Sequence, residues 1–379
     1  MAQRFRIIHC LRAPVGGLFR HVRDLAVEQA SRGHEIGVVC DASSKDPLTE
    51  ERLAALAPRL ALGLHKIGMS RDIGLSDLTA TRAVYDLAVA ARVDILHGHG
   101  AKGGAYARFA GQKRARLGGA GRVFYTPHGG SLHYDPASLI GRAYMAAERH
   151  MARMTSGLIF ESAYAERVFR DKVGDVACPL RVIHNGIQPA ELEPVAADAA
   201  AADFLFVGEL RRLKGVDVLL QAFAEVRRTH SCRLMIVGAG PDAEAFRAEA
   251  TTLGLEAVVT FAGAMPARQA FALGRVLVMP SRAESFPYIA LEAAGAGLPL
   301  IASNVGGVPE IVSGTDTPLV APGDAAALAL ALTQAIREPA VLHQRAQRLR
   351  QQIGQRFSVA AMAEQVLAFY GDVAQKAAA

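Results

Sequence analysis

The chain has 379 residues, of which 51% are apolar and 21% are charged, with four cysteines and no tryptophan. A chain of this length is expected to form two or three domains, each large enough for its own core. No uncharged apolar run reaches about 18 residues, which argues against a membrane-spanning helix. The N-terminal residues lack the long apolar segment and cleavage site of a signal peptide, so none is expected.

Basic residues slightly outnumber acidic ones, with 42 Lys and Arg against 36 Asp and Glu. Aromatic residues are only 6% of the chain and do not alternate with basic ones, which argues against nucleic-acid binding. Positive charge gathers at Lys113, Arg114, Arg116 and Arg122. This basic cluster is either a solvated loop or a surface that attracts anionic lipid headgroups.

The cysteines have neither metal-ligand spacing nor the pattern of a disulfide framework. They are Cys10, Cys40, Cys178 and Cys232, and three of them lie in or beside apolar runs. Such residues are typical of a reduced core, so we expect a cytoplasmic protein. Because of the basic cluster, a peripheral location of the protein at the inner face of the membrane stays open.

The first half of the chain alternates apolar runs with helix-length segments. Residues 5–9 are the first expected strand, and a turn at 14–17 leads to residues 18–31, whose apolar positions have helical spacing. Further strands are expected at 35–40, 95–97, 123–126, 158–160 and 182–183. The alternation predicts a mostly parallel, doubly wound sheet.

The second half repeats this pattern after a Pro- and Ala-rich stretch at 188–203, which is interpreted as an interdomain linker. Its expected strands are 204–207, 233–237, 258–261, 276–279 and 300–302. The pattern predicts an α/β protein with two Rossmann-like domains, 1–187 and 188–354, facing a central cleft. Apolar positions at helical spacing predict a final helix within 355–379.

The most informative feature is a pair of glutamates eight residues apart, Glu284 and Glu292. Glu284 follows an apolar run that ends at Pro280, and Pro287 suits the first turn of a helix. The two carboxylates are then roughly 12 Å apart along the helix axis. This is too far for an acid and base acting on one bond. It suits the two ends of an extended ligand with phosphate at the helix start, as in a nucleotide sugar.

A second strand-to-helix turn follows, with the sequence Asn-Val-Gly-Gly-Val-Pro-Glu at 304–310. Two successive turns of this kind create an anion-binding edge at the carboxyl ends of parallel strands. From Glu284 to Glu310 the chain resembles the retaining glycosyltransferases of the GT-B fold, specifically their fourth family (group 1 glycosyl transferases). The motifs follow the family order along nearly the whole chain.

The resemblance implies roles for individual residues. Glu284 contacts the donor sugar, Glu292 binds the ribose hydroxyls, and Lys214 binds the diphosphate. His128, in the run Tyr-Thr-Pro-His-Gly-Gly, lies beside the donor sugar. The implied catalytic residues are therefore His128, Lys214 and Glu284. The implied donor-binding residues are Gly16, Gly17, Gly208, Arg211, Arg212, Lys214, Gly238, Ser285, Phe286, Pro287, Tyr288 and Glu292.

One position departs from the family pattern. Glu209 stands where the family has arginine in the G-R-L-x-x-x-K-G motif, and either Arg211 or Arg212 is the candidate replacement. Two other histidines, His97 and His99, are expected to be structural, although His99 could contact the acceptor. Residues 131–135 are expected to line the acceptor side.

The resemblance implies a hexosyltransferase that retains the anomeric configuration and uses no cofactor. Its donor is a nucleoside-diphosphate sugar, most simply a UDP or GDP sugar, and its acceptor is a glycan or a lipid-linked glycan of polysaccharide or glycolipid synthesis. No carboxylate pair suits a metal, and a fixed cation with helix N-termini can stabilise the leaving diphosphate.

Three other activities stay open. A non-hydrolysing sugar-nucleotide epimerase shares the fold but needs acid and base carboxylates around the sugar. A dinucleotide oxidoreductase needs G-x-G-x-x-G after the first strand, which Gly16-Gly17 does not fit, although Asp41 after the second strand is a hint. An inactive nucleotide-sugar sensor is the binding-module alternative, and the joint presence of His128, Lys214, Glu284 and Glu292 argues against it.

Overall fold

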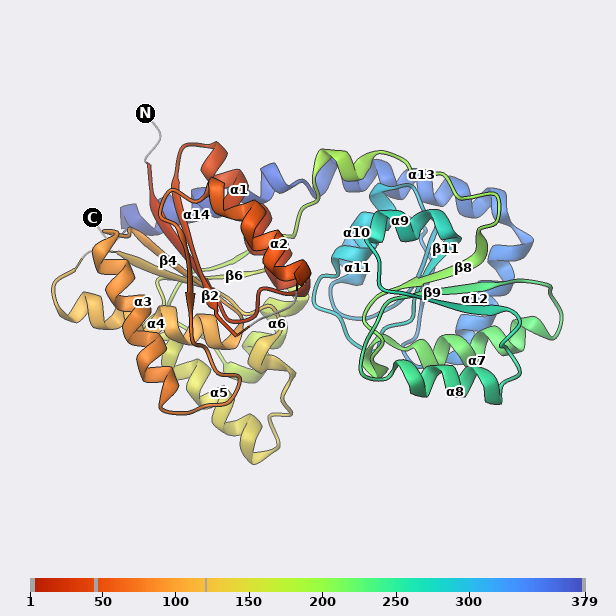
Figure 1. The fold of residues 1–379 in the computed structure, drawn as a ribbon, viewed down its shortest axis with the longest axis horizontal. Coiled ribbons are helices and arrows are strands. Elements are labelled where there is room, and N and C mark those ends of the chain that lie inside the picture. Colours follow the sequence, from red (N-terminus) through yellow and green to blue (C-terminus); the bar gives the residue numbers. More distant parts are fainter. Residues whose placement is uncertain (1–3, 44–46, 120, 377–379) are drawn as a thin grey trace. The chain divides into compact units, whose positions relative to one another are not determined.

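The computed structural model describes residues 4–43, 47–119 and 121–376. Its contacts divide the chain into two compact units. The N-terminal unit comprises residues up to Asn185 together with residues from Val359 onward, and the C-terminal unit is Gly186–Ser358. The chain therefore crosses between units twice, at 185–186 and at 358–359 (Figure 1).

The N-terminal unit contains a seven-stranded parallel sheet in the order β3-β2-β1-β4-β5-β6-β7. Its strands are β1 (Arg6–Leu11), β2 (Glu35–Asp41), β3 (Leu64–Ile67), β4 (Ile95–His99), β5 (Arg122–Thr126), β6 (Gly157–Phe160) and β7 (Leu180–Val182). Its helices are α1 (Gly16–Ser31), α2 (Pro47–Leu56), α3 (Ser76–Ala90), α4 (Gly100–Arg116), α5 (Leu139–Ala152), α6 (Ala163–Val173) and α14 (Val359–Lys376), with short 3₁₀ turns at Ala57–Arg59 and Gly130–His133.

Alternate residues of the strands enter cores on opposite faces of this sheet, as expected for a parallel sheet covered on both sides. On β5, Phe124 packs with residues of α1 and α14. Its neighbours Val123 and Tyr125 pack on the other face, where α3, α4, α5 and α6 lie. The sheet is thus a two-sided core, and its strand order reverses between β1 and β4.

The C-terminal unit contains a six-stranded parallel sheet in the order β10-β9-β8-β11-β12-β13. Its strands are β8 (Ala202–Val207), β9 (Leu234–Val237), β10 (Val259–Gly263), β11 (Gly274–Met279), β12 (Leu300–Ser303) and β13 (Leu319–Val320). Its helices are α7 (Val216–Arg227), α8 (Ala243–Thr252), α9 (Ala267–Ala270), α10 (Tyr288–Gly295), α11 (Val308–Val312), α12 (Ala325–Arg337) and α13 (Pro339–Arg356), with 3₁₀ turns at Pro189–Leu192, Arg212–Lys214 and Phe271–Leu273.

Two cores sandwich this second sheet. One joins α7, α8 and α12 to strand residues such as Phe204 and Val278. The other joins α10, α11 and the end of α13 to strand residues such as Leu205 and Met279. The strand order reverses between β8 and β11, so the loops after these two strands are neighbours at the carboxyl edge.

The predicted α/β fold with two Rossmann-like sheets is confirmed, but the predicted linker at 188–203 is wrong. Residues Pro189–Leu192 form a 3₁₀ turn with a capping box, in which Glu191 accepts a hydrogen bond from the Gln188 backbone. Leu192 packs against the α10 and α13 core, and its carbonyl accepts bonds from Arg350. The segment is therefore part of the C-terminal unit. Strands β3 and β13 were not predicted, because they are short and only partly apolar.

No single helix in the described ranges is long and apolar enough to span a membrane. Helices α12 and α13 meet the length and composition test only together, and they are bent by 102° where they join. Both contribute buried residues to the cores of the C-terminal unit, including Leu332 and Leu349.

Helix α14 completes the N-terminal unit, although it lies at the end of the sequence. In Figure 1 it is the blue helix beside the red α1, against which it packs. The ring of Phe369 packs edge-on against Phe124, with 5.5 Å between ring centroids, and the ring of Tyr370 lies 4.5 Å from Phe124. This last helix therefore covers the centre of the first sheet.

We expect Phe369→Ala to destabilise the N-terminal unit by about 3–5 kcal/mol, because it removes a large, fully buried ring from this contact. Hydrogen exchange of the β5 and β6 amides in the full-length chain measures the loss. The matched control is Gln365→Ala, on the exposed side of the same helix. Equal protection in both variants would show that α14 adds little to the unit.

Candidate active site

The loops that follow β8 and β11 bring the predicted catalytic pair of the C-terminal unit into direct contact. The Nζ atom of Lys214 lies 2.7 Å from Oε1 of Glu284, and the hydroxyl of Ser281 donates to the same oxygen at 2.7 Å. The Glu284 side chain is only 8% exposed and that of Lys214 is 27% exposed. The sequence predicted both residues at the ligand, and the structure places them side by side.

Two glycines allow these loops to approach so closely. Gly215 has φ +72°, and a Cβ there would lie 2.0 Å from the carbonyl oxygen of Pro280. Gly306 has φ +59°, and a Cβ there would lie 1.7 Å from the carbonyl oxygen of Glu284. A side chain at either position would both strain the backbone and collide with the neighbouring loop. The glycines therefore set the position of Glu284.

A second ion pair fixes the same loops, and the sequence did not predict it. Both terminal nitrogens of Arg282 contact the carboxylate of Asp217 at 2.7 Å, and Arg282 also donates to the Arg212 carbonyl at 2.6 Å. Burial would raise the pKa of Asp217, but the hydrogen bonds from Arg282 outweigh it and the pKa is lowered. Arg282 thus fastens the β11 loop to the start of α7.

The position that departs from the family pattern is on the surface. Glu209 forms an ion pair with Arg211 at 3.6 Å, and both side chains are about half exposed. Such pairs contribute little stability. Arg212 lies 3.8 Å from Asp217, so both candidate arginines have an acidic partner in the C-terminal unit.

The other donor-binding residues that were predicted in this unit differ in how much of each residue a ligand could contact. Gly208 and Gly238 follow β8 and β9 and touch, because a Cβ on Gly238 would lie 1.8 Å from the Gly208 carbonyl oxygen. The backbone carbonyl of Ser285 accepts a hydrogen bond from the Gly307 backbone N–H at 2.8 Å. Phe286, Pro287 and Tyr288 are buried, so a ligand could reach mainly their backbone. Glu292 is half-buried in the second turn of α10.

The predicted residues of the N-terminal unit lie at the carboxyl edge of its own sheet. Gly16 and Gly17 begin α1, whose first backbone N–H groups have no partner within the helix. His128 follows β5 and has φ +49°, a left-handed conformation that is uncommon outside glycine. Backbone strain of this kind concentrates at functional sites.

His128 is the half-buried end of an otherwise buried chain of hydrogen bonds. Its Nε2 lies 3.1 Å from His99 Nδ1, His99 Nε2 lies 3.0 Å from His9 Nδ1, and His9 Nε2 lies 2.8 Å from Gln29 Oε1. The Gln29 oxygen only accepts, so each ring donates toward Gln29 and accepts from the next ring. This order leaves Nδ1 of His128 unprotonated, as a hydrogen-bond acceptor.

Two further histidines adjoin this chain. His97 is fully buried between Tyr370, with Nδ1 2.6 Å from the phenol oxygen, and Thr126, with Nε2 2.9 Å from the hydroxyl. His97 is thus structural, as predicted. His21 pairs its Nδ1 with Asn185 at 2.9 Å, while its buried Nε2 has no partner among the described residues. His9 and His21 were missed by the sequence analysis, although the register sets His9 beside His97 on adjacent strands.

Nitrogens of two histidine trios are close enough to share a metal ion. They are His9, His97 and His99, and His21, His99 and His128, each within 4.8 Å. Every nitrogen of the first trio already has a hydrogen-bond partner. Both trios are neutral and include no carboxylate. The expected absence of a metal from the reaction stays a prediction.

Burial keeps these imidazoles neutral. It lowers the pKa of His9 to about 4 and the pKa of His21 and His128 to about 3, with repulsion from His128 adding to the effect at His21. The pKa values of His97 and His99 are also well below the ordinary value, for the same reason. At neutral pH any proton transfer by these histidines would therefore start from an uncharged ring.

A cavity of about 970 Å³ adjoins this cluster within the N-terminal unit. His99 and His128 line part of its wall, with Ser131 and Tyr134 from the stretch that was expected on the acceptor side. The rest of the wall comes mainly from α3, α4 and α5.

These pKa values predict an acid-sensitive N-terminal unit. Below about pH 6.5 the unfolded histidines take up protons while the folded ones stay neutral, so stability present above this pH is lost as pH falls. Each buried histidine should lower the unfolding free energy by up to ~1.4 kcal/mol per pH unit. We expect hydrogen exchange, corrected for intrinsic rates, to show protection lost from β1 and β4 between pH 7 and 5. Protection of β8 and β11 is the internal control, and equal losses in both sheets would contradict the prediction.

Two family models match the chain. The model described as Glycosyltransferase Family 4 matches residues 15–191, and the model described as Glycosyl transferases group 1 matches residues 201–338. A glycogen synthase of Mycobacterium tuberculosis is 28% identical over 375 residues, covering 89% of this chain and 87% of that protein.

Solved structures show the same fold. Sucrose-phosphate synthase from Thermosynechococcus elongatus has a TM-score of 0.81 at 23% identity, with 98% of this chain and 100% of that chain covered. HepE of Anabaena, solved in complex with UDP-glucose, has a TM-score of 0.81 at 19% identity, with 97% and 100% covered. The fold is therefore GT-B. With family matches in both units, the protein belongs to the group 1 glycosyl transferases of glycosyltransferase family 4.

Proposed function

We propose that this glycosyltransferase moves a hexose from a nucleoside-diphosphate sugar to a glycan or lipid-linked acceptor, with retention at the anomeric carbon. The observation that carries the proposal is the contact of Lys214 with Glu284 at the carboxyl edge where the strand order reverses. This is the place in an open α/β sheet where nucleotides bind. The UDP-glucose in the HepE structure is consistent with such a donor.

In the proposed complex the diphosphate displaces Glu284 as the partner of Lys214. The ammonium group then neutralises the charge that builds on the leaving diphosphate, helped by backbone N–H groups at the starts of α7 and α10. Glu284, released from Lys214 but still 2.7 Å from the Ser281 hydroxyl, is proposed to accept a hydrogen bond from a hydroxyl of the transferred sugar. Glu292 binds the ribose diol.

The proposed reaction is a front-face displacement. The acceptor hydroxyl oxygen bonds to the anomeric carbon on the side from which the diphosphate departs, and the bond from that carbon to the β-phosphate oxygen breaks. The hydroxyl proton passes to the departing phosphate oxygen, giving a glycoside and a nucleoside diphosphate. His128, with an unprotonated Nδ1, is proposed to accept a hydrogen bond from the donor sugar, and no metal or cofactor takes part.

This function places the protein in polysaccharide or glycolipid synthesis. A non-hydrolysing epimerase would bind the same donor, but it needs acid and base carboxylates around the sugar, whereas the Glu284 carboxylate, only 8% exposed, is paired with Lys214. Conversion of the sugar nucleotide in the absence of any acceptor would favour that second candidate.

A panel of nucleoside diphosphates and nucleotide sugars in a thermal-shift assay tests the donor. One base is expected to raise Tm, since a ligand that binds only the folded state stabilises it by mass action. In Glu292→Ala the matched diphosphate and its sugar should both bind ~2–4 kcal/mol more weakly, because charge-assisted bonds to the ribose are lost. Glu256→Ala, an exposed glutamate in the same unit, is the control. A panel without any stabilising member would overturn the proposed donor class.

Substitutions at the ion pair should separate binding from chemistry. Lys214→Gln should weaken diphosphate binding, whereas Glu284→Gln should leave it unchanged or tighter, because the competing carboxylate is gone. Turnover should fall by about two or more orders of magnitude in both. Calorimetry with the diphosphate and a donor-consumption assay measure the two effects.

The same assay in EDTA is expected to show full activity. A loss that Mg²⁺ or Mn²⁺ restores would contradict the metal-free mechanism. Weaker diphosphate binding in Glu284→Gln would place that carboxylate at the phosphates rather than at the sugar.

A further inference from the structure

The cavity of the N-terminal unit opens among exposed aliphatic side chains. Five of them lie where the β3–α3 loop and the starts of α3 and α5 meet the cavity: Ile73, Leu75, Leu78, Leu139 and Ile140, which are 63–85% exposed. Ile73, Leu78 and Ile140 line the cavity itself. Scattered surface leucines are common, but exposed aliphatic residues that line one cavity together indicate a binding surface.

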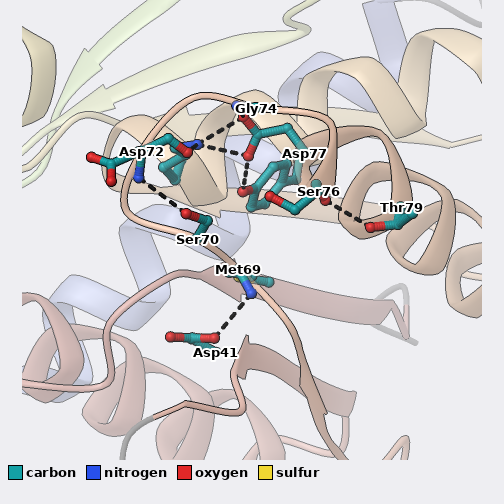
Figure 2. Close-up of polar contacts among 10 residues, drawn as sticks. Asp41, Met69, Ser70, Asp72, Gly74, Ser76, Asp77 and Thr79 are labelled. Carbon is teal, nitrogen blue, oxygen red and sulfur yellow. Dashed lines mark hydrogen bonds and ion pairs between the residues drawn. The ribbon is translucent and has the colours of Figure 1, made fainter.

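The loop that carries two of these residues is held in one position. Figure 2 shows it folded around Asp77, which accepts hydrogen bonds from the Gly74 backbone at 3.0 Å and from Lys102 at 2.6 and 2.8 Å. Tyr106 of α4 also donates to Asp77, at 2.5 Å. The loop base is tied by Met69, whose backbone donates to Asp41 at 2.9 Å. Hydrogen bonds thus fix the position of this loop, and in that position Ile73 and Leu75 are exposed.

The charges along the cavity leave a positive excess. The acidic groups in the wall are each paired: Asp77 with Lys102, and Glu148 with the buried Arg108 at 2.8 Å. Two other cations of the wall, Arg12 and Arg71, form no ion pair with a described carboxylate. An anionic group therefore suits the cavity better than a cationic one.

The basic cluster noted in the sequence does not supply this charge. Arg114 turns inward to the Val93 carbonyl, and Lys113 lies over the ring of Tyr85, 4.4 Å from its centroid. None of Lys113, Arg114, Arg116 and Arg122 lines the cavity. The attraction for an anion comes from Arg12 and Arg71 instead.

We propose that this cavity binds the hydrocarbon chain and phosphate of a lipid-linked acceptor. The volume, about 970 Å³, is at the upper end for a small-molecule site and suits a long chain. The chain leaves through the aliphatic opening, the phosphate meets Arg12 and Arg71, and the hydroxyl to be glycosylated points toward His128. The identification of the ligand as an acceptor depends on the proposed function, whereas its binding does not.

The test uses the full-length protein and dodecyl phosphate as the probe, titrated by calorimetry below its micellar concentration. Dodecyl phosphate is expected to bind, inorganic phosphate to bind far more weakly, and dodecyl maltoside, which lacks the charge, to fall between them. In Ala147→Phe the new ring occupies the cavity, and affinity should drop by about tenfold or more, since several methylene groups lose their contacts.

Matched controls keep the test specific. Ala147 and Ala146 are both exposed on α5, but only Ala147 lines the cavity, so Ala146→Phe should bind dodecyl phosphate like the natural chain. Ala143→Phe is a second cavity-filling variant on the same helix, in case one variant folds poorly. Leu78→Ser should weaken binding, whereas Leu330→Ser, 73% exposed in the other unit, should not.

Three outcomes would overturn the proposal. They are no binding of dodecyl phosphate, equal binding by Ala147→Phe and Ala146→Phe, and retention on phosphatidylglycerol vesicles that is lost in Leu78→Ser while dodecyl phosphate binding is kept. The last would make the aliphatic group a membrane contact rather than an acceptor site. Diphosphate binding separates this result from the proposed function: if the nucleoside diphosphate binds and the probe does not, only the lipid site fails.

Discussion

Every strand pair described in the two sheets is parallel, and this constraint determines where chemistry can occur. In a parallel sheet all strand-to-helix loops leave from one edge, and the loops on either side of a reversal in strand order lie next to each other. In the C-terminal unit the reversal brings the Lys214 loop against the Glu284 loop. In the N-terminal unit the corresponding reversal, between β1 and β4, brings His9 beside His97.

The two edges stabilise their polar groups in different ways. In the C-terminal unit, ion pairs link one loop to the next, and Gly215 and Gly306 allow backbone to touch backbone. The cations of these pairs are partly exposed to solvent, whereas their carboxylates are largely buried. In the N-terminal unit the polar groups are buried, so they are neutral and depend on hydrogen bonds. One edge is therefore suited to holding an anion, and the other to orienting uncharged groups.

Most strands, the helices α1, α10, α11 and α14 and the Glu284–Glu292 motif could be predicted because they depend on local patterns, namely apolar runs, glycine turns and spacing along one helix. The linker was placed wrongly because a Pro- and Ala-rich segment such as 188–203 looks the same whether it is free or packed through Leu192. The histidine chain was missed because His9 is on β1, His99 is on β4 and His128 follows β5, and the sequence does not reveal the order of these strands in the sheet. The cavity was missed because Leu78 and Ile140, at helix starts, resemble core residues until their exposure is known.

The hydrogen-bond chain from Gln29 to His128 has a polarity, and one amide group determines it. If the Gln29 side chain rotated by half a turn, its nitrogen would face His9, and all three rings would have to shift their protons to the opposite nitrogen. His128 would then present a donor instead of an acceptor, with no change in the position of any heavy ring atom. Gln29 is fully buried, so this rotation would have to take place inside the packed core of the N-terminal unit. The orientation of one buried amide on α1 thus determines whether His128, three side chains away, offers a donor or an acceptor.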